Sequence, residues 1–143
     1  MDTKLSVCKN AEALLKFLYQ IDKTLPVPLS ERVDMEKFAS DSVQNFVYTV
    51  EQDGQIVCAA LFYFHFLNQP FAYFDLLATV PGYEGRGYAR FLMDAAEDTA
   101  RKAGMTEFHL HANETNTRAV DFYKRRGYEV IETVHKLHMA KVL

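Results

Sequence analysis

A glycine-rich stretch between two apolar segments contains the residue types best suited to chemistry. It runs from Val80 to Arg90 and reads Val-Pro-Gly-Tyr-Glu-Gly-Arg-Gly-Tyr-Ala-Arg. The apolar run before it, Phe71 to Thr79, predicts a strand, and the periodic pattern from Arg86 to Ala103 predicts a long helix. The first N–H groups of a helix have no intrahelical acceptor and lie at the positive end of the helix dipole. This junction therefore suits an anion, above all a phosphate.

The stretch matches neither of two well-known phosphate-binding loops. A P-loop requires Lys and then Ser or Thr after its last glycine, whereas Tyr88 follows Gly87 here. The dinucleotide-binding motif requires a third glycine where this chain has Arg90, and a βαβ unit where the preceding segments look antiparallel. Gly85 and Gly87 still remove side chains that would hold a ligand away from the backbone amides. A glycine-rich turn by itself is weak evidence for an anion site, so the interpretation depends on the rest of the chain.

Length and composition are those of an ordinary globular protein. The chain has 143 residues, of which 49% are hydrophobic and 24% are charged, enough for one domain with its own core. The formal net charge of −3 gives no general attraction to nucleic acid or to an anionic membrane. We expect no nucleic-acid or membrane partner, and any anion site must be local.

Cysteine usage and the N-terminal residues bear on the compartment. Cys8 and Cys58 form no paired motif, which favours buried free thiols over a disulfide. The first residues, Met-Asp-Thr-Lys-Leu-Ser, have no apolar segment behind their charges. The apolar run from Ile56 to Leu67 is too short to span a bilayer. These features predict a cytoplasmic protein.

The segments before the glycine-rich stretch predict helices and then antiparallel strands. Asn10 is a candidate N-cap for a helix that reaches about Lys23, and Ser30 is a candidate cap for a second, short helix. The runs Asn45 to Gln52 and Gln55 to Phe66 predict strands, and the Asp-Gly pair between them is a strong hairpin turn. With the strand that ends at Thr79, these make three consecutive antiparallel strands.

The segments after it complete a mixed sheet. Thr106 to Ala112 predicts a strand, Arg118 to Arg126 a helix that ends at Gly127, and Tyr128 to Leu143 two closing strands. This order predicts an α/β (α+β) fold in a single domain over residues 1–143. Its sheet should be mixed, mostly antiparallel and twisted, with about six to seven strands and about four helices on both faces.

Two motifs in this order coincide with one family. Glu84-Gly85-Arg86-Gly87-Tyr88-Ala89 follows the strand end Thr79-Val80-Pro81, and Asn116, Tyr123 and Gly127-Tyr128 follow downstream. From about Gln44 to the C-terminus, the chain resembles the GNAT superfamily of acyl-CoA-dependent N-acyltransferases. The signature of that family is Gln or Arg, two variable residues, Gly, one variable residue, and Gly or Ala.

The resemblance implies a binding mode for acetyl-CoA as co-substrate. The pantetheine arm would hydrogen-bond along the strand edge at Leu77, Ala78 and Thr79, as an added strand would. Asn116 is carried over as a further cofactor contact, with a plain helix cap as its structural alternative. The diphosphate would lie against the amides of the glycine-rich stretch, from Gly85 through Arg86, Gly87, Tyr88 and Ala89 to Arg90.

One residue departs from the signature. The first position is usually Gln or Arg, and this chain has Glu84. Because a carboxylate would repel a diphosphate, we expect Glu84 to point to solvent. The affinity for the anion would then depend on Arg86, Arg90 and the backbone amides.

The resemblance also implies catalytic roles. Tyr123 matches the family tyrosine near the sulfur of CoA, which donates a proton to the departing thiolate or hydrogen-bonds it. Its structural alternative is a ring that fills a helix–sheet interface. His111 occupies the strand position at which some members carry a Glu that acts as base, and Asp75 is a second candidate because its strand is otherwise apolar. For both, the alternative is a polar residue on a partly wet sheet face.

The histidines and aromatic residues leave further possibilities. His109 and His111 lie on one strand face, but no third ligand has a telling spacing, and His135 and His138 belong to a distant closing strand. No metal site is therefore predicted. Most aromatic residues of the central strands are expected in the core. Tyr63, His65 and Tyr73 are candidates to line an acceptor cleft.

The implied activity is transfer of the acetyl group of acetyl-CoA to a primary amine of an unidentified small molecule or peptide, by direct attack on the thioester. One alternative is an acyltransferase that uses another acyl-CoA. Another is a catalytically idle acyl-CoA sensor, although a sensor has no need of Tyr123 at the sulfur. The sequence is compatible with a homodimer and does not identify the acceptor.

Overall fold

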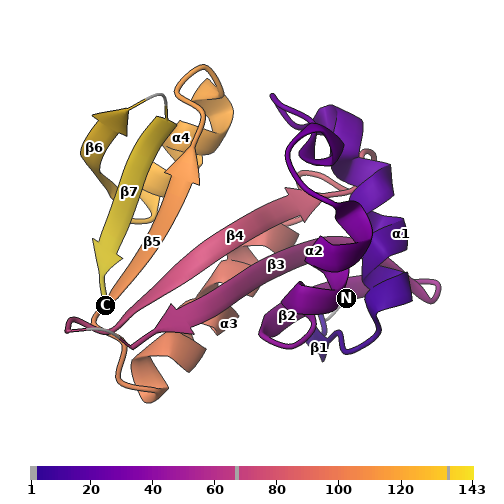
Figure 1. The fold of residues 1–143 in the computed structure, drawn as a ribbon, viewed down its shortest axis with the longest axis horizontal. Coiled ribbons are helices and arrows are strands. Elements are labelled where there is room, and N and C mark those ends of the chain that lie inside the picture. The colour runs from indigo at the N-terminus through magenta and orange to yellow at the C-terminus, as the bar shows by residue number, and fades with distance from the viewer. Residues whose placement is uncertain (1–2, 67, 135) are drawn as a thin grey trace. The chain divides into compact units, whose positions relative to one another are not determined.

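The computed structural model describes residues 3–66, 68–134 and 136–143. Over these residues the chain forms seven strands and four α-helices, with the strand order β1-β2-β3-β4-β5-β7-β6 (Figure 1). The residues group into two compact units, which we describe one at a time. The first unit comprises Met1–Phe62 and Asp75–Ala96, and the second comprises Tyr63–Phe74 and Glu97–Leu143.

The strand pairings give the mixed sheet that the sequence predicts. β4 and β5 pair in parallel, and the pairs β1–β2, β2–β3, β5–β7 and β6–β7 are antiparallel. The predicted α/β class, with a mostly antiparallel sheet and about four helices, is confirmed. The strands are β1 (Ser6–Val7), β2 (Phe46–Gln52), β3 (Gln55–His65), β4 (Phe71–Thr79), β5 (Glu107–Ala112), β6 (Glu129–Val134) and β7 (Lys136–Val142).

The helices begin where local capping signals allow. They are α1 (Ala11–Ile21), α2 (Met35–Ser42), α3 (Tyr88–Lys102) and α4 (Thr117–Arg125). Asn10 caps α1 as predicted, because its side chain accepts from the N–H groups of Glu12 and Ala13. Among the described residues, no helix has the length and apolar character needed to cross a membrane.

The predicted start of the second helix is wrong. Ser30 lies in a short 3₁₀ segment, and its N–H and hydroxyl donate to the buried carboxylate of Asp22 at 2.9 and 2.6 Å. Asp34 caps α2 instead, accepting from the Lys37 N–H at 3.2 Å. A tertiary contact with Asp22 therefore occupies the side chain that the sequence pattern assigns to a cap.

The first unit supports the end of β4. In this unit, α1 and α2 lie on one face of the strands and the start of α3 lies on the other (Figure 1). Leu14, Leu18 and Ile21 of α1 are fully buried in the core beneath these helices, and Leu76, Ala78 and Val80 pack against the same core. This packing fixes the strand end from which the glycine-rich turn departs.

The second unit holds α4 through a buried carboxylate. Glu97 of α3 is 2% exposed and accepts from the Tyr128 hydroxyl at 2.8 Å, Lys141 Nζ at 3.0 Å and an Arg126 Nη at 3.2 Å. These donors belong to the chain just beyond α4 and to β7. The cluster therefore anchors the end of α4, the helix that begins after Asn116 and contains Tyr123.

Candidate functional site

The glycine-rich turn has the backbone geometry that an anion site requires. Gly82, Gly85 and Gly87 have φ values of 96°, 76° and 81°, in the left-handed region that glycine adopts without steric cost. The conformation of Gly87 is not helical, so α3 begins at Tyr88, two residues later than predicted. The first helical hydrogen bond joins the Phe91 N–H to the Gly87 carbonyl at 3.0 Å. The amides of residues 88–90 therefore have no intrahelical acceptor.

Two arginines lie beside this turn in different ways. A Cβ atom at Gly87 would lie 3.4 Å from an Nη atom of Arg90, so the Arg90 guanidinium covers the glycine. Arg86 lies 4.9 Å from the ring centroid of Tyr83 and donates weakly to the Gly82 carbonyl at 3.4 Å. Both cations therefore lie at the turn, Arg90 beside Gly87 and Arg86 beside Tyr83 and Gly82.

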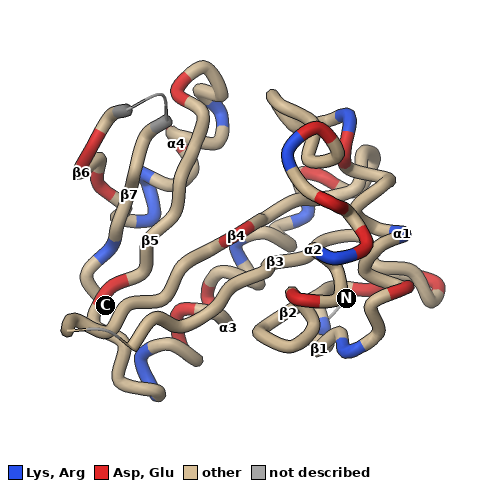
Figure 2. The backbone as a smooth tube through the Cα atoms, viewed as in Figure 1, with Lys and Arg blue, Asp and Glu red and all other residues tan. Residues whose placement is uncertain are grey.

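The charges around the turn agree with a local anion site. Glu84 is exposed, as the sequence analysis expects, and so are Arg86 and Arg90. Residues of both signs are interspersed along the chain rather than segregated (Figure 2). A phosphate would therefore be attracted by the local charges of the turn and the start of α3, and not by a broad basic surface.

Tyr88 contributes to this turn through its backbone. Its side chain is buried, and its hydroxyl accepts from Gln52 Nε2 at 3.0 Å. The ring fixes the first turn of α3 against β2. The backbone N–H of Tyr88 remains available for the predicted contact with the cofactor, whereas its side chain does not.

The last residues of β4 form the strand end at which the sequence analysis expects the pantetheine arm to hydrogen-bond. Leu77, Ala78 and Thr79 are half-buried, and the Thr79 hydroxyl lies 3.3 Å from Cys58 Sγ. Burial raises the pKa of Cys58 to about 11, so this thiol stays neutral. Cys58 is the buried free thiol that the sequence predicts, whereas Cys8 is a half-buried free thiol.

Asn116 and Tyr123 lie on α4 in the second unit. Asn116 is the N-cap, and its Oδ1 accepts from the Ala119 N–H at 3.4 Å, so its structural alternative is realised. Tyr123 follows two turns later on the same helix face. Burial raises the pKa of Tyr123 to about 12.

The ring of Tyr123 also has a structural role. It makes edge-to-face contacts with Phe122 and Tyr128, at centroid distances of 5.5 and 6.0 Å. The ring therefore packs against its aromatic neighbours on α4 and just beyond it. The structural alternative for this residue, a packed ring, is therefore realised, and its catalytic role stays a prediction.

Two candidates for the base differ in their surroundings. His111 is exposed on β5, and its Nδ1 lies 2.5 Å from the Tyr73 hydroxyl of β4. The Asp75 residue as a whole is exposed on β4, but the surrounding protein partly desolvates its carboxyl, which raises the pKa of that group to about 6. Sequence reasoning missed the pairing of Tyr73 with His111, because the two residues are 38 positions apart and only the β4–β5 pairing joins them.

The prediction that His138 is distant from the other histidines is wrong. β7 pairs with β5, His138 stands opposite His111, and His138 Nε2 lies 2.7 Å from His109 Nδ1. His109 Nε2 in turn lies 2.9 Å from a Glu107 oxygen. His135 lies outside the described residues. Among the residues that are described, no group of three or more His, Cys, Asp or Glu side chains could hold a metal ion.

The structure brings the predicted residues together in two sets. In the first unit, Leu77–Thr79, the glycine-rich turn and the start of α3 are contiguous, and Asp75 lies earlier on the same strand. In the second unit, His111 joins Tyr73, while Asn116 and Tyr123 share α4.

Residues 14–128 match the model of the acetyltransferase (GNAT) family. This chain is a member of that family. The match extends from α1 to the third residue after α4, so it includes the turn, Asn116 and Tyr123. The resemblance drawn from the signature and the downstream Asn and Tyr is confirmed at the level of the family.

Solved structures of GNAT proteins share the fold. Arabidopsis thaliana Naa50, solved with the bisubstrate analogue CoA-Ac-MVNAL, is 18% identical, with a TM-score of 0.81 and full coverage of both chains. The PaiA N-acetyltransferase of Thermoplasma acidophilum, solved with coenzyme A, is 15% identical, with a TM-score of 0.78 and full coverage of both chains. At these identities the likeness establishes the fold alone.

A curated relative shares a shorter segment. Mycothiol acetyltransferase of Propionibacterium freudenreichii is 34% identical over 58 residues, which are 41% of this GNAT chain and 19% of that protein. The aligned segment thus spans less than one fifth of the relative. Its substrate belongs to that protein and does not identify the acceptor here.

Proposed function

We propose that this GNAT protein is an N-acetyltransferase that moves the acetyl group of acetyl-CoA to a primary amine of a small molecule or peptide. The observation that carries the proposal is the junction of β4, the turn and α3. Gly85 and Gly87 adopt left-handed conformations there, and the amides of residues 88–90 have no intrahelical acceptor. These features suit a diphosphate, which CoA carries.

We propose the following roles in binding the co-substrate. The amides of the turn and the Arg90 guanidinium bind the diphosphate, and Arg86 adds charge nearby. The backbone of Leu77–Thr79 pairs with the amides of the pantetheine arm. The Asn116 side chain contributes a further contact through its N–H groups, because its Oδ1 is already used in the helix cap.

The reaction is a direct transfer. The amine nitrogen attacks the thioester carbonyl carbon, a C–N bond forms, and the C–S bond breaks with its electron pair on sulfur. The amine loses one proton to the base, for which we propose His111, hydrogen-bonded to Tyr73. Asp75 is the second candidate, because a carboxyl with a pKa of about 6 is ionised at neutral pH and more basic than an ordinary carboxylate. A backbone N–H near Ala78 would stabilise the oxyanion.

The pKa of Tyr123 decides how it serves the leaving group. A phenol with a pKa of about 12 is a weaker acid than an alkyl thiol, whose pKa is roughly 8.5. Full proton transfer to the thiolate would therefore be uphill by roughly 5 kcal/mol. Tyr123 thus acts chiefly by donating a hydrogen bond to the negative charge that develops on sulfur, which needs no ionised phenolate.

The test combines a Tyr123→Phe variant with a panel of primary amines, acetyl-CoA and an assay for released thiol. A charge-assisted hydrogen bond of about 1.5–3 kcal/mol corresponds to a fall in kcat of roughly 10- to 100-fold. The KM for acetyl-CoA should change little, since the bond strengthens during the reaction. Tyr19→Phe, which alters an exposed tyrosine of α1, is the matched control and should retain full activity.

The outcomes separate the alternatives. Binding of CoA without turnover on any amine would favour an acyl-CoA sensor, and turnover only with a longer donor would favour another acyl-CoA specificity. An unchanged kcat in Tyr123→Phe would remove the assignment of that residue. We also propose that a homodimer is compatible with the fold, which light scattering of the purified chain would test.

A further inference from the structure

The hydroxyl of Tyr88 is held by a strand that lies far from it in the sequence. Gln52 Nε2 donates to this hydroxyl at 3.0 Å, across 36 positions of the chain. Gln52 is half-buried and Tyr88 is only 8% exposed, so water competes poorly for the bond at the tyrosine. Both residues belong to the first unit. The contact therefore ties the first residue of α3 to the last residue of β2.

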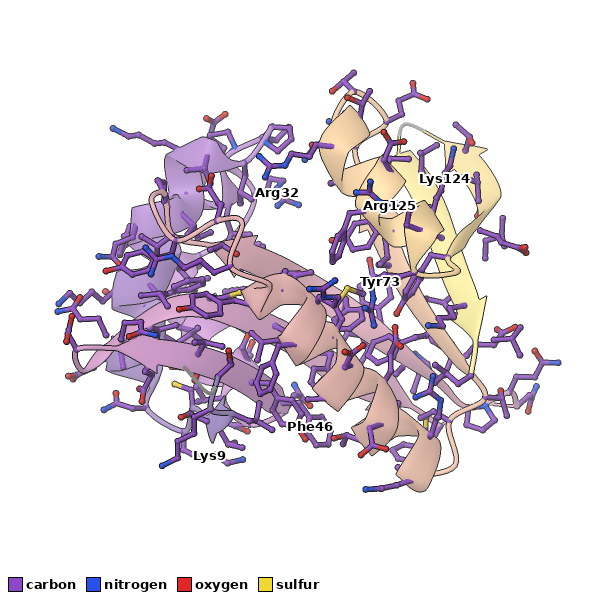
Figure 3. The ribbon with its side chains drawn as sticks, turned by 180° about the vertical axis from the view of Figure 1, so that it is seen from behind. Lys9, Arg32, Phe46, Tyr73, Lys124 and Arg125 are labelled. Atoms are coloured by element: carbon purple, nitrogen blue, oxygen red, sulfur yellow. The ribbon has the colours of Figure 1, made fainter. Side chains whose placement is uncertain are left out.

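The Gln52 end of this contact belongs to a well-defined part of the backbone. Gln52 pairs with Gln55 in the β2–β3 ladder, and the turn between them, Asp53 and Gly54, has left-handed φ values of 53° and 76°. The strand begins at Phe46, labelled in Figure 3, which shows the strands from the side of α3. A two-residue turn of this kind fixes the register of its strands. Gln52 therefore offers a fixed point for the side chain that it bonds.

The Tyr88 end of the contact lies at the glycine-rich turn. The N–H of Tyr88 is the first of three amides, at residues 88–90, that have no intrahelical acceptor. Gly87, which precedes it with φ of 81°, has no Cβ atom and restricts the backbone little. The direction of the three amides therefore depends on contacts made by the side chains that follow the glycine. The buried side chain of Tyr88 makes such a contact.

We propose that Gln52 is a positioning residue for the diphosphate of CoA: by holding the Tyr88 side chain, it keeps the amides of residues 88–90 aligned before the ligand binds. This inference rests on the proposed function, in which those amides bind the diphosphate. Gln52 touches no part of CoA in this scheme and acts only through Tyr88. A site that is ordered in advance loses less conformational freedom on binding, and its affinity is higher for that reason.

The test is a Gln52→Leu variant, which retains an apolar side chain of similar bulk but cannot donate a hydrogen bond. Loss of one hydrogen bond of ordinary strength should raise the Kd for CoA, measured by calorimetry, roughly 2- to 10-fold. The kcat at saturating acetyl-CoA should not change, because the diphosphate is bound equally in the ground state and in the transition state. The loss should therefore appear in the KM for acetyl-CoA.

The hairpin itself supplies a matched control. Gln55 is the exposed strand partner of Gln52 across the same turn, so Gln55→Leu makes the same chemical change beside it and should leave the Kd unchanged. Tyr88→Phe removes the other partner of the bond and should weaken CoA binding to a similar degree. Because the two residues act through one bond, the double variant should bind no more weakly than Gln52→Leu alone. Tm values of all variants establish that they are folded.

Two further readouts separate alignment of the amides from a general loss of structure. S-acetylpantetheine carries the thioester and the pantetheine arm but no diphosphate, so its kcat/KM should be equal in wild type and in Gln52→Leu. The Phe91 N–H donates to the Gly87 carbonyl and closes the first turn of α3. Hydrogen exchange of that amide, in protein without ligand, should be faster in Gln52→Leu than in Gln55→Leu.

The outcomes separate this inference from the proposed function. A wild-type protein that binds CoA, with an unchanged Kd in Gln52→Leu, would overturn the inference and leave the proposed function standing. A rise in Kd of equal size in Gln55→Leu, or an equal loss of activity with S-acetylpantetheine, would also overturn it. Failure of the wild type to bind CoA would overturn the proposed function, and faster Phe91 exchange in Gln52→Leu would then still support the ordering of the first turn by Gln52.

Discussion

The buried carboxylate of Glu97 gives the most direct test of how the second unit is held together. The perturbation is Glu97→Gln, which preserves the shape and removes the charge. The amide retains a contact for the Tyr128 hydroxyl but loses the charge that compensates Lys141 and Arg126. The side chains of those two cations are only 22% and 12% exposed, so water replaces the lost partner incompletely.

The expected cost follows from these contacts. Each charge-assisted hydrogen bond contributes about 1.5 kcal/mol at the lower end of its range, and two are lost. The sum of about 3 kcal/mol agrees with the lower end of the cost of breaking a buried ion pair. For a chain of this size, that loss corresponds to a fall in Tm of roughly 10 °C.

The control is Asp98→Asn, one position along the same helix. Asp98 pairs with Lys102 at 2.9 Å, but their side chains are 57% and 77% exposed, so the pair is worth less than about 1 kcal/mol. Thermal and urea unfolding of both variants, monitored by circular dichroism, gives the comparison. If the two variants lose equal stability, burial does not strengthen the Glu97 cluster and the reasoning fails.

Two further predictions concern Asp75 and Gly87. Because burial raises the Asp75 pKa from 3.8 to about 6, the fold favours the protonated carboxyl; the stability that this group contributes is complete below about pH 3.8 and is lost as pH rises through 6. Asp75→Asn should therefore be more stable than wild type at pH 7.5 but not at pH 3.5. The gain should be less than about 1 kcal/mol, because the residue is exposed. Thermal unfolding of both proteins at both pH values tests this, and a variant that is more stable only at pH 3.5 would contradict it. Gly87→Ala strains a backbone with φ of 81° and crowds Arg90, so calorimetry should show weaker CoA binding. Gly104→Ala, with φ of 89° and nothing within 4 Å of the added Cβ atom, should lose stability without losing affinity; equal affinities in both variants would refute the role of the turn.

Features that depend on neighbouring residues could be predicted from the sequence. Asp53 and Gly54 have φ values of 53° and 76°, the left-handed pair that the Asp-Gly hairpin signal demands. The β4 strand has its predicted bounds, and Asn10 caps α1 through bonds that reach two and three residues along the chain. Glycines with positive φ stand at the turn before α3. In each case the signal and its structural consequence lie within a few residues of each other.

Tertiary structure decided the features in which distant residues compete for a side chain. Ser30 bonds to Asp22 instead of capping a helix, and the buried Tyr88 side chain bonds to Gln52, a contact that the sequence does not predict. Neither outcome has a local signature, because the partner lies 8 residues away in one case and 36 in the other.

The two parts of the candidate site differ in the same way: one depends on neighbouring residues and the other on residues far apart in the sequence. The turn and the start of α3 follow from glycine conformations and from the unpaired amides of any helix start, so the sequence by itself determined them. The bonds of Tyr73 to His111 and of His138 to His109 join residues 38 and 29 positions apart. They exist because β5 pairs with β4 on one side and with β7 on the other, and strand order is settled by the packing of the whole chain rather than by any one segment.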